Sequence, residues 1–162
     1  MTNDDKSLVF EYFRSIKEKD IDSLLDLFTE DAVIYEPFSK LSTAGDGLRD
    51  RTAMRAFFQV AAMASDGLEY NITSQESRQV DEEYTINRNN CNNNSRNIGK
   101  ARNSSAITAL VRFERGSSAN ARFIFETVNC PASNTLTRNK GGDERTRETR
   151  KIKNLRIEFL NA

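Results

Sequence analysis

The sequence contains no histidine, which narrows the chemistry that the chain could perform. Ser-His-Asp and Cys-His nucleophile systems are excluded, as are zinc and iron sites built on imidazole ligands. Acid–base chemistry would therefore come from Asp, Glu, Tyr, Lys or Cys side chains. Glu126 is one candidate, because it shares a face of a predicted strand with Ile124 and Val128. Apolar neighbours favour the neutral form of a carboxyl, which can donate a hydrogen bond.

Arg112 and Glu114 form a second group of interest. They are two residues apart on another predicted strand, so their side chains share a face of the sheet. Glu126 could reach them from the neighbouring strand. An ordinary surface ion pair between Arg112 and Glu114 explains the same pattern and would contribute little to stability.

The first part of the chain must position these groups with two helices and a short strand. Apolar side chains recur with helical period over residues 4–18, which predicts an amphipathic helix. A second short helix is predicted to begin at the capping residue Asp20 and to run through Phe28. Residues 32–36 then read as a short strand that Pro37 ends.

A third helix is predicted after a polar loop at residues 39–51. Thr52 is its expected cap, and the turn Asp66-Gly67 is its expected end. Beyond this turn the apolar period changes from helical to alternating, which is typical of strands. The predicted strands contain residues 68–72, 107–113, 121–128 and 155–159.

Two polar segments, at about 87–105 and 131–151, interrupt this order and are expected to be long loop insertions. The remaining pattern predicts one domain spanning residues 1–162. Helices followed by long antiparallel strands indicate an α+β fold. We expect a cone-shaped barrel in which a strongly curved, mostly antiparallel sheet wraps around the N-terminal helices and leaves a hollow.

Composition and charge indicate where the chain works. The formal net charge is zero, and no apolar run approaches the roughly 20 residues that a membrane span needs. The N-terminus is polar, so we expect a cytoplasmic protein, with Cys91 and Cys130 as free thiols. The basic, Asn-rich stretch at 87–105 is expected to be a solvated loop, because aromatic side chains for base stacking are missing from it. Neither membrane nor nucleic-acid binding is predicted.

Three segments resemble the nuclear transport factor 2-like superfamily, in its SnoaL-like and ketosteroid-isomerase branches. The first, residues 20–38, combines an aspartate-rich short helix, Glu-Asp-Ala, a strand and acid-Pro-Phe; the second is the helix with Ala56-Phe57-Phe58; the third is the final strand at 151–159. The resemblance implies a domain that binds a small, largely apolar molecule without cofactor or metal and pairs as a homodimer. It also implies an isomerase or cyclase that moves a proton next to a carbonyl.

Carried over residue by residue, the resemblance assigns three catalytic positions. Tyr12 falls on the oxyanion-hole tyrosine, Glu36 on the general base and Glu126 on a second oxyanion-hole acid. In both acid positions Glu replaces Asp, so each carboxyl is displaced by one methylene. The expected lining of the substrate pocket is Phe13, Tyr35, Phe38, Phe57, Phe58, Arg112 and Phe123.

Other interpretations of these positions stay open. Tyr12 on an apolar helix stripe is also what a core aromatic looks like. Glu36 is also what a solvated strand end looks like, and Glu126 could pair across strands with Arg112 or Arg156. Arg112 with Glu114 and Glu126 resembles the epoxide-hydrolase arrangement of the same superfamily. The remaining alternative is a non-catalytic ligand-binding or dimerisation module, with an interior that is filled rather than hollow.

Overall fold

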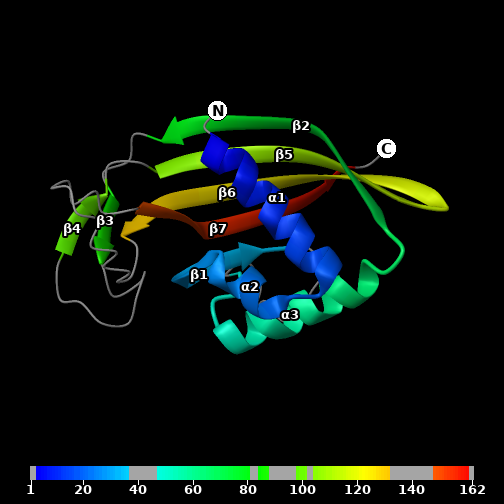
Figure 1. Cartoon of the computed structure of the whole chain (residues 1–162), viewed down its shortest axis with the longest axis horizontal. Coiled ribbons are helices and arrows are strands. Elements are labelled where there is room, and N and C mark those ends of the chain that lie inside the picture. The colour runs from blue at the N-terminus through cyan, green and yellow to red at the C-terminus, as the bar shows by residue number, and fades with distance from the viewer. Residues whose placement is uncertain are drawn as a thin grey trace, which may run out of the picture.

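The computed structural model describes residues 3–36, 47–80, 84–87, 98–101, 104–131 and 148–160. Helices from the N-terminal half lie across one face of an open, twisted sheet (Figure 1). This arrangement confirms the predicted α+β class with a mostly antiparallel sheet. Among the described residues the sheet is not closed into a barrel. Its two faces have different surroundings because the helices cover one of them. The helices are α1 (Asn3–Glu18), α2 (Ile21–Asp26) and α3 (Arg51–Ala64).

The first helix buries the stripe that its sequence period predicts. The side chains at its buried positions pack into the main core cluster, and the opposite face of α1 is exposed to solvent. The period of 3.6 residues places the apolar positions on one side, which is the side that faces the sheet. The buried stripe consists of Leu8, Val9, Tyr12, Phe13 and Ile16.

The second helix begins as predicted and ends earlier. The Asp20 carboxylate accepts hydrogen bonds from the backbone N–H of Ser23 at 3.1 Å and from its hydroxyl at 2.7 Å. These two bonds hold the pKa of Asp20 below its ordinary value. The helix stops at Asp26, because the chain enters the first strand at Phe28 and pairs there with Ile152. The predicted extension of the helix through Phe28 is wrong, since pairing with a distant strand overrides local period.

The third helix has a different cap from the one predicted. Asp50, rather than Thr52, is the N-cap, and its carboxylate accepts the backbone N–H of Ala53 at 3.1 Å. Its other end fits the prediction: Gly67 follows the helix with a φ of +73°, a left-handed conformation that glycine adopts without steric cost.

The main sheet has five strands in the order β1-β7-β6-β5-β2. Only the β1–β7 pair is parallel; the others are antiparallel. A separate antiparallel pair joins β3 and β4. The strands are β1 (Phe28–Tyr35), β2 (Glu69–Val80), β3 (Tyr84–Asn87), β4 (Ile98–Ala101), β5 (Ser104–Arg115), β6 (Ser117–Pro131) and β7 (Glu148–Leu160).

The faces of the sheet alternate residue by residue, as the period of a strand requires. On β6, Phe123 and Phe125 are buried beneath the helices, and Ile124 between them is only half-buried. We call the helix-covered face the inner face and the opposite one the outer face. On the outer face of the same strand, Arg122 is also half-buried and Glu126 is exposed, so β6 is covered on its inner face alone.

The expected loop insertions are shorter than predicted. Strand β4 lies inside the segment 87–105, and β7 begins at Glu148, inside the segment 131–151. Residues 88–97 and 132–147 lie outside the described residues. Local composition did not predict these strands, because they are stabilised by hydrogen bonds to strands far away in sequence, which the composition of a polar segment does not indicate.

Cys130, near the end of β6, is 1% exposed and disulfide-bonded. The prediction of free thiols is therefore wrong for Cys130. That prediction followed from the expected cytoplasmic location, where disulfides are rare. Cys91 lies outside the described residues.

Among the helices that the structure describes, none combines the length and the apolar character that crossing a bilayer requires.

Candidate functional site

Tyr12, the predicted oxyanion-hole donor, lies in the centre of an aromatic cluster. Its side chain is 1% exposed, and its ring centroid is 5.1 Å from that of Phe13 and 5.2 Å from that of Phe125. Phe28, Phe58 and Phe123 surround it at 6.4, 6.3 and 6.1 Å. Burial raises the pKa of Tyr12 far above its ordinary value. Around Tyr12 the interior is filled by rings, as expected of a core aromatic.

Toward one end of the inner face, this cluster continues into partly exposed rings. Phe13 lies 5.5 Å from Tyr70, and Phe123 lies 6.1 Å from Phe113. Phe113 in turn stacks on Phe159 at 6.5 Å, and Phe159 is 45% exposed. Burial also raises the pKa of Tyr70, although a hydrogen bond with Ser65 opposes this change. We call Phe13, Tyr70, Phe113, Phe123 and Phe159 the aromatic end.

Glu126 does not face the interior. It is exposed on the outer face, where its carboxylate accepts a hydrogen bond of 2.6 Å from the Asn154 side chain. Phe125 and Thr127 on either side of it are buried. Tyr12 and Glu126 therefore lie on opposite faces of the sheet. Because both faces of β6 carry apolar residues, the sequence did not indicate which face the helices cover.

Glu36 is half-buried and directly follows β1, so it lies at an edge strand of the sheet. Its neighbour Tyr35 is also half-buried, and the guanidinium of Arg156 lies over the Tyr35 ring at 5.2 Å. Phe38, another predicted lining residue, lies outside the described residues. Of the predicted lining, the fold brings together on the inner side Phe13, Phe57, Phe58 and Phe123.

Arg112 and Glu114 form the ion pair that their spacing predicts. Arg112 Nε lies 2.8 Å from Glu114 Oε1, and the two side chains are 50% and 42% exposed. Arg112 pairs with Asn120, and Glu126 lies six residues further along β6, about 20 Å away at the usual rise of a strand. The structure therefore does not bring Glu126 to this pair, and Arg112 lies apart from the aromatic rings that it was expected to join.

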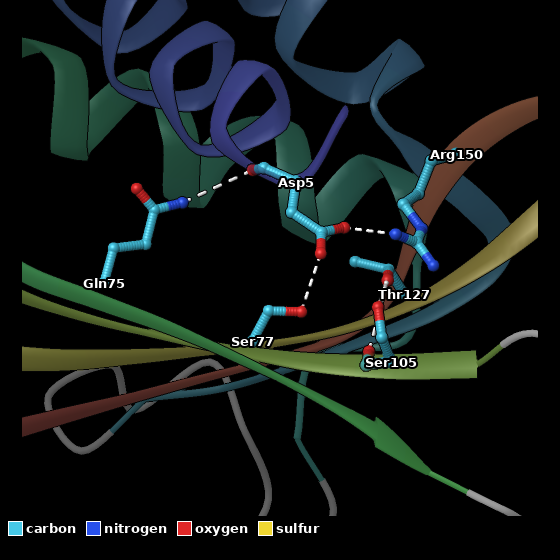
Figure 2. A network of polar contacts seen from close by, with 6 residues as sticks. All are labelled: Asp5, Gln75, Ser77, Ser105, Thr127 and Arg150. Carbon is cyan, nitrogen blue, oxygen red and sulfur yellow. Dashed lines mark hydrogen bonds and ion pairs between the residues drawn. The ribbon is translucent and has the colours of Figure 1, made fainter. Parts of the chain in front are cut away.

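A buried polar cluster, which the sequence did not single out, lies toward the opposite end of the inner face (Figure 2). Asp5 on α1 is 1% exposed, and its carboxylate accepts hydrogen bonds from Ser77 Oγ at 2.6 Å and from Arg150 Nη1. The Gln75 amide donates to the Asp5 backbone carbonyl at 3.4 Å. One carboxylate thus ties α1 to two different strands, β2 and β7.

Two buried hydroxyl groups belong to the same region. Ser105 Oγ and Thr127 Oγ1 are 3.0 Å apart, and Thr127 also donates to the Ser105 carbonyl at 3.1 Å. Arg150 is diagonal to Thr127 in the β6–β7 register, which places both on the inner face. The polar end is defined as Asp5, Gln75, Ser77, Ser105, Thr127 and Arg150.

The polar end was missed for a specific reason. Arg150 falls inside the segment that its composition assigns to a polar loop, and Asp5 falls in the polar N-terminus. The signal that could have found Arg150 is the alternation of side chains along a strand. Ile152 lies two residues further on and is buried on the inner face, so Arg150 shares that face.

A surface hollow of about 280 Å³ lies between α2 and α3. It differs from the predicted apolar pocket because most of its lining is charged, and both of its arginines form ion pairs. Arg55 lies 2.6 Å from Asp22, and Arg51 lies 3.0 Å from Glu30 and donates to the Leu25 carbonyl at 2.7 Å. The lining consists of Asp22, Leu25, Asp26, Arg51, Thr52 and Arg55.

Comparison with known families places the chain. The family model of the SnoaL-like domain matches residues 9–119, which is more than half of the chain. The chain therefore belongs to the SnoaL-like domain family, one of the two branches that its sequence resembles. No curated protein sequence matches the chain.

Solved structures are similar in fold. A protein from Xanthomonas campestris, assigned as a calcium/calmodulin dependent protein kinase II association domain, matches with a TM-score of 0.57 and 12% identity, over 96% of this chain and 84% of that one. An NTF2-like protein from Burkholderia xenovorans LB400 matches at 0.45 and 13%, over 99% and 92%. A protein from Sinorhizobium meliloti, assigned as a polyketide cyclase, matches at 0.41 and 16%, over 94% of both chains. At these identities the first match supports the fold alone.

Proposed function

We propose that this chain is a small-molecule-binding SnoaL-like domain whose ligand is a small, largely apolar molecule held at the aromatic end. The observation that carries this proposal is the series of rings that runs from fully buried Tyr12 to Phe159, which is 45% exposed. Ile72 is 41% exposed and adds apolar surface on β2, the strand that pairs with β5.

The physical support is the cost of leaving these groups in water. Burying apolar surface stabilises a complex by roughly 25 cal/mol per Å², and aromatic rings add directional edge and stacking contacts. Tyr70 and Phe113 are in edge contact at 5.3 Å and are both only half-buried. A planar apolar ligand would extend this ring packing outward and cover Phe159.

The test is binding of an apolar fluorescent dye, with extraction and mass spectrometry of whatever copurifies with the chain. Phe159→Ala should weaken dye binding about tenfold, which corresponds to about 1.4 kcal/mol of lost contact. Phe10→Ala is a matched control, because Phe10 is 62% exposed on α1, away from the aromatic end. Equal dye affinity in Phe159→Ala and the unaltered chain would overturn the proposal.

Proton transfer next to a carbonyl, as in an isomerase or a cyclase, remains part of the proposal through Glu36. Of the three predicted catalytic positions, Tyr12 is packed among rings and Glu126 lies on the outer face, so Glu36 is the remaining candidate base. Glu36→Gln should abolish turnover of an enolisable ketone while the far-ultraviolet circular dichroism stays unchanged. Glu126→Gln should leave the rate unaltered. Turnover that is equal in Glu36→Gln and the unaltered chain would remove the catalytic role.

A homodimer formed through the outer face is the second proposal, and the composition of that face favours it. Half-buried Leu110 and Ile124 lie beside the ion pair Arg122–Glu158, whose atoms are 3.1 Å apart. A two-fold axis could oppose such mixed charges and bury the apolar groups. Light scattering after size exclusion should give twice the chain mass, and Ile124→Arg should halve it. Val60→Arg on α3 is the control; a monomeric unaltered chain would contradict the dimer.

The cytoplasmic location stays a prediction, and the disulfide at Cys130 argues against it, because disulfides are rare where glutathione keeps thiols reduced. Thiol alkylation of the chain in intact cells, followed by mass spectrometry, measures whether Cys130 is oxidised in its own compartment. A fully alkylated Cys130 would support the cytoplasmic prediction.

A further inference from the structure

We propose that the polar end binds an oxyanion, a carboxylate or a phosphate group, on the Nε–Nη2 edge of Arg150. This site is separate from the aromatic end. Arg150 pairs with Asn129 and Phe159 pairs with Ala121, eight residues apart on β6 and about 26 Å at the usual rise of a strand. The proposal therefore stands or falls independently of the apolar ligand.

The buried guanidinium of Arg150 has hydrogen-bonding capacity that its neighbours do not use. Arg150 is 14% exposed in its side chain, and its Nη1 donates to Asp5. Its Nε is buried and has no partner among the described residues. A guanidinium carries five N–H donors, and leaving a buried donor unpaired is unfavourable, so such an atom calls for a ligand or a water.

The geometry of the Arg150 guanidinium also suits an oxyanion. Nε and Nη2 present two parallel N–H groups on one edge of the guanidinium, and this fork matches two oxygens of a carboxylate or a phosphate. Asp5 contacts Arg150 through the other terminal nitrogen, Nη1, so the fork is not used by this ion pair. The Arg150 side chain is not fully enclosed, since 14% of it is exposed.

The charges around Arg150 also bear on anion binding. Asp5 does not depend on Arg150 alone, because it lies in the first turn of α1 and also accepts the Ser77 hydroxyl at 2.6 Å. The positive end of the helix dipole stabilises a carboxylate in this turn. Asp5 would therefore keep other stabilising contacts if a second anion drew on part of the charge of Arg150. Figure 2 shows that the guanidinium meets Asp5 from the side of Thr127 and Ser105.

The test follows the Arg150 Nε–H resonance of the full chain by NMR while sodium acetate or sodium phosphate is added at constant ionic strength. The expected result is a saturable shift with half-saturation in the millimolar range, and chloride should cause none. The acetate and phosphate arms show which oxyanion the fork prefers, and saturation by either supports the proposal. A shift that does not saturate or that chloride causes equally, or a Nε–H that contacts only a bound water, would overturn it.

A matched pair of variants tests the fork itself. Arg150→Lys keeps a positive charge beside Asp5 and deletes the Nε–Nη2 edge, so anion affinity should fall at least about tenfold. Arg156→Lys makes the same change on the same strand, at a residue exposed on the outer face, and should leave affinity unaltered. Equal losses in both variants would contradict the site. If Arg150→Lys does not fold, the titration of the unaltered chain decides alone.

Discussion

The two ends of the inner face lie on the same strands and are stabilised in opposite ways. At the aromatic end, Phe113 and Phe159 stack at 6.5 Å, and Phe159 stays 45% exposed to solvent. At the polar end, the Asp5 carboxylate is almost fully buried and is satisfied by Ser77 and Arg150. Apolar packing tolerates partial exposure, whereas a buried charge requires a defined partner. Substitutions at the two ends should therefore behave differently.

The largest effect is expected between the two ends, in the ring cluster around Tyr12. Phe58→Ala should lower the free energy of unfolding by about 3–5 kcal/mol, because the Phe58 side chain is fully buried and its loss leaves a cavity. Urea denaturation measures this change. Phe159→Ala at the exposed end should cost far less, and similar losses in the two variants would remove the distinction between centre and aromatic end.

A comparable effect is expected when one partner of the buried ion pair is removed. Asp5→Ala should cost about 3–5 kcal/mol, because it leaves the Arg150 guanidinium buried without its carboxylate. The double variant Asp5→Leu with Arg150→Met should recover most of this loss, since an apolar pair needs no ionic partner. The double-mutant cycle in urea compares this variant with Asp5→Leu and Arg150→Met alone, and simple additivity would mean that the two residues are not coupled.

A smaller effect is expected at the start of α3, the helix that holds Phe58 over the aromatic cluster. Asp50→Ala should cost about 1 kcal/mol, because it removes the acceptor for the Ala53 backbone N–H. Thr52→Ala is the matched control and should stay within about 0.5 kcal/mol, since Thr52 lies exposed inside the helix. A larger loss of stability in Thr52→Ala than in Asp50→Ala would instead support Thr52 as the N-cap, as the sequence predicted.

The smallest effect is expected on the outer face. Glu126→Gln should change the free energy of unfolding by less than about 0.5 kcal/mol, because the side chain is exposed and the amide can still accept from Asn154. Thermal denaturation with and without the variant measures this. A marked stabilisation would show that the carboxylate is strained or buried, as an inner-face acid would be.

Local sequence patterns predicted much of this fold. The stripe at Leu8, Tyr12 and Ile16 predicted α1 and its buried face, and alternation predicted the inner positions of β5 and β7. The segment after Asp20 indicated the family, which the SnoaL-like model confirms over residues 9–119. Local period and capping chemistry are encoded within a few residues, so they can be recognised without knowing what lies across the sheet.

Which side chains meet in space could not be predicted from these local patterns. The helices cover the face of Phe125 rather than that of Glu126, so an acid assigned to the interior lies in solvent. The strand register separates Arg112 from Glu126 and brings Arg150 from one end of the chain to Asp5 at the other. The physical reason is that strand pairing and helix packing join residues far apart in sequence, and local pattern contains no information about these partners.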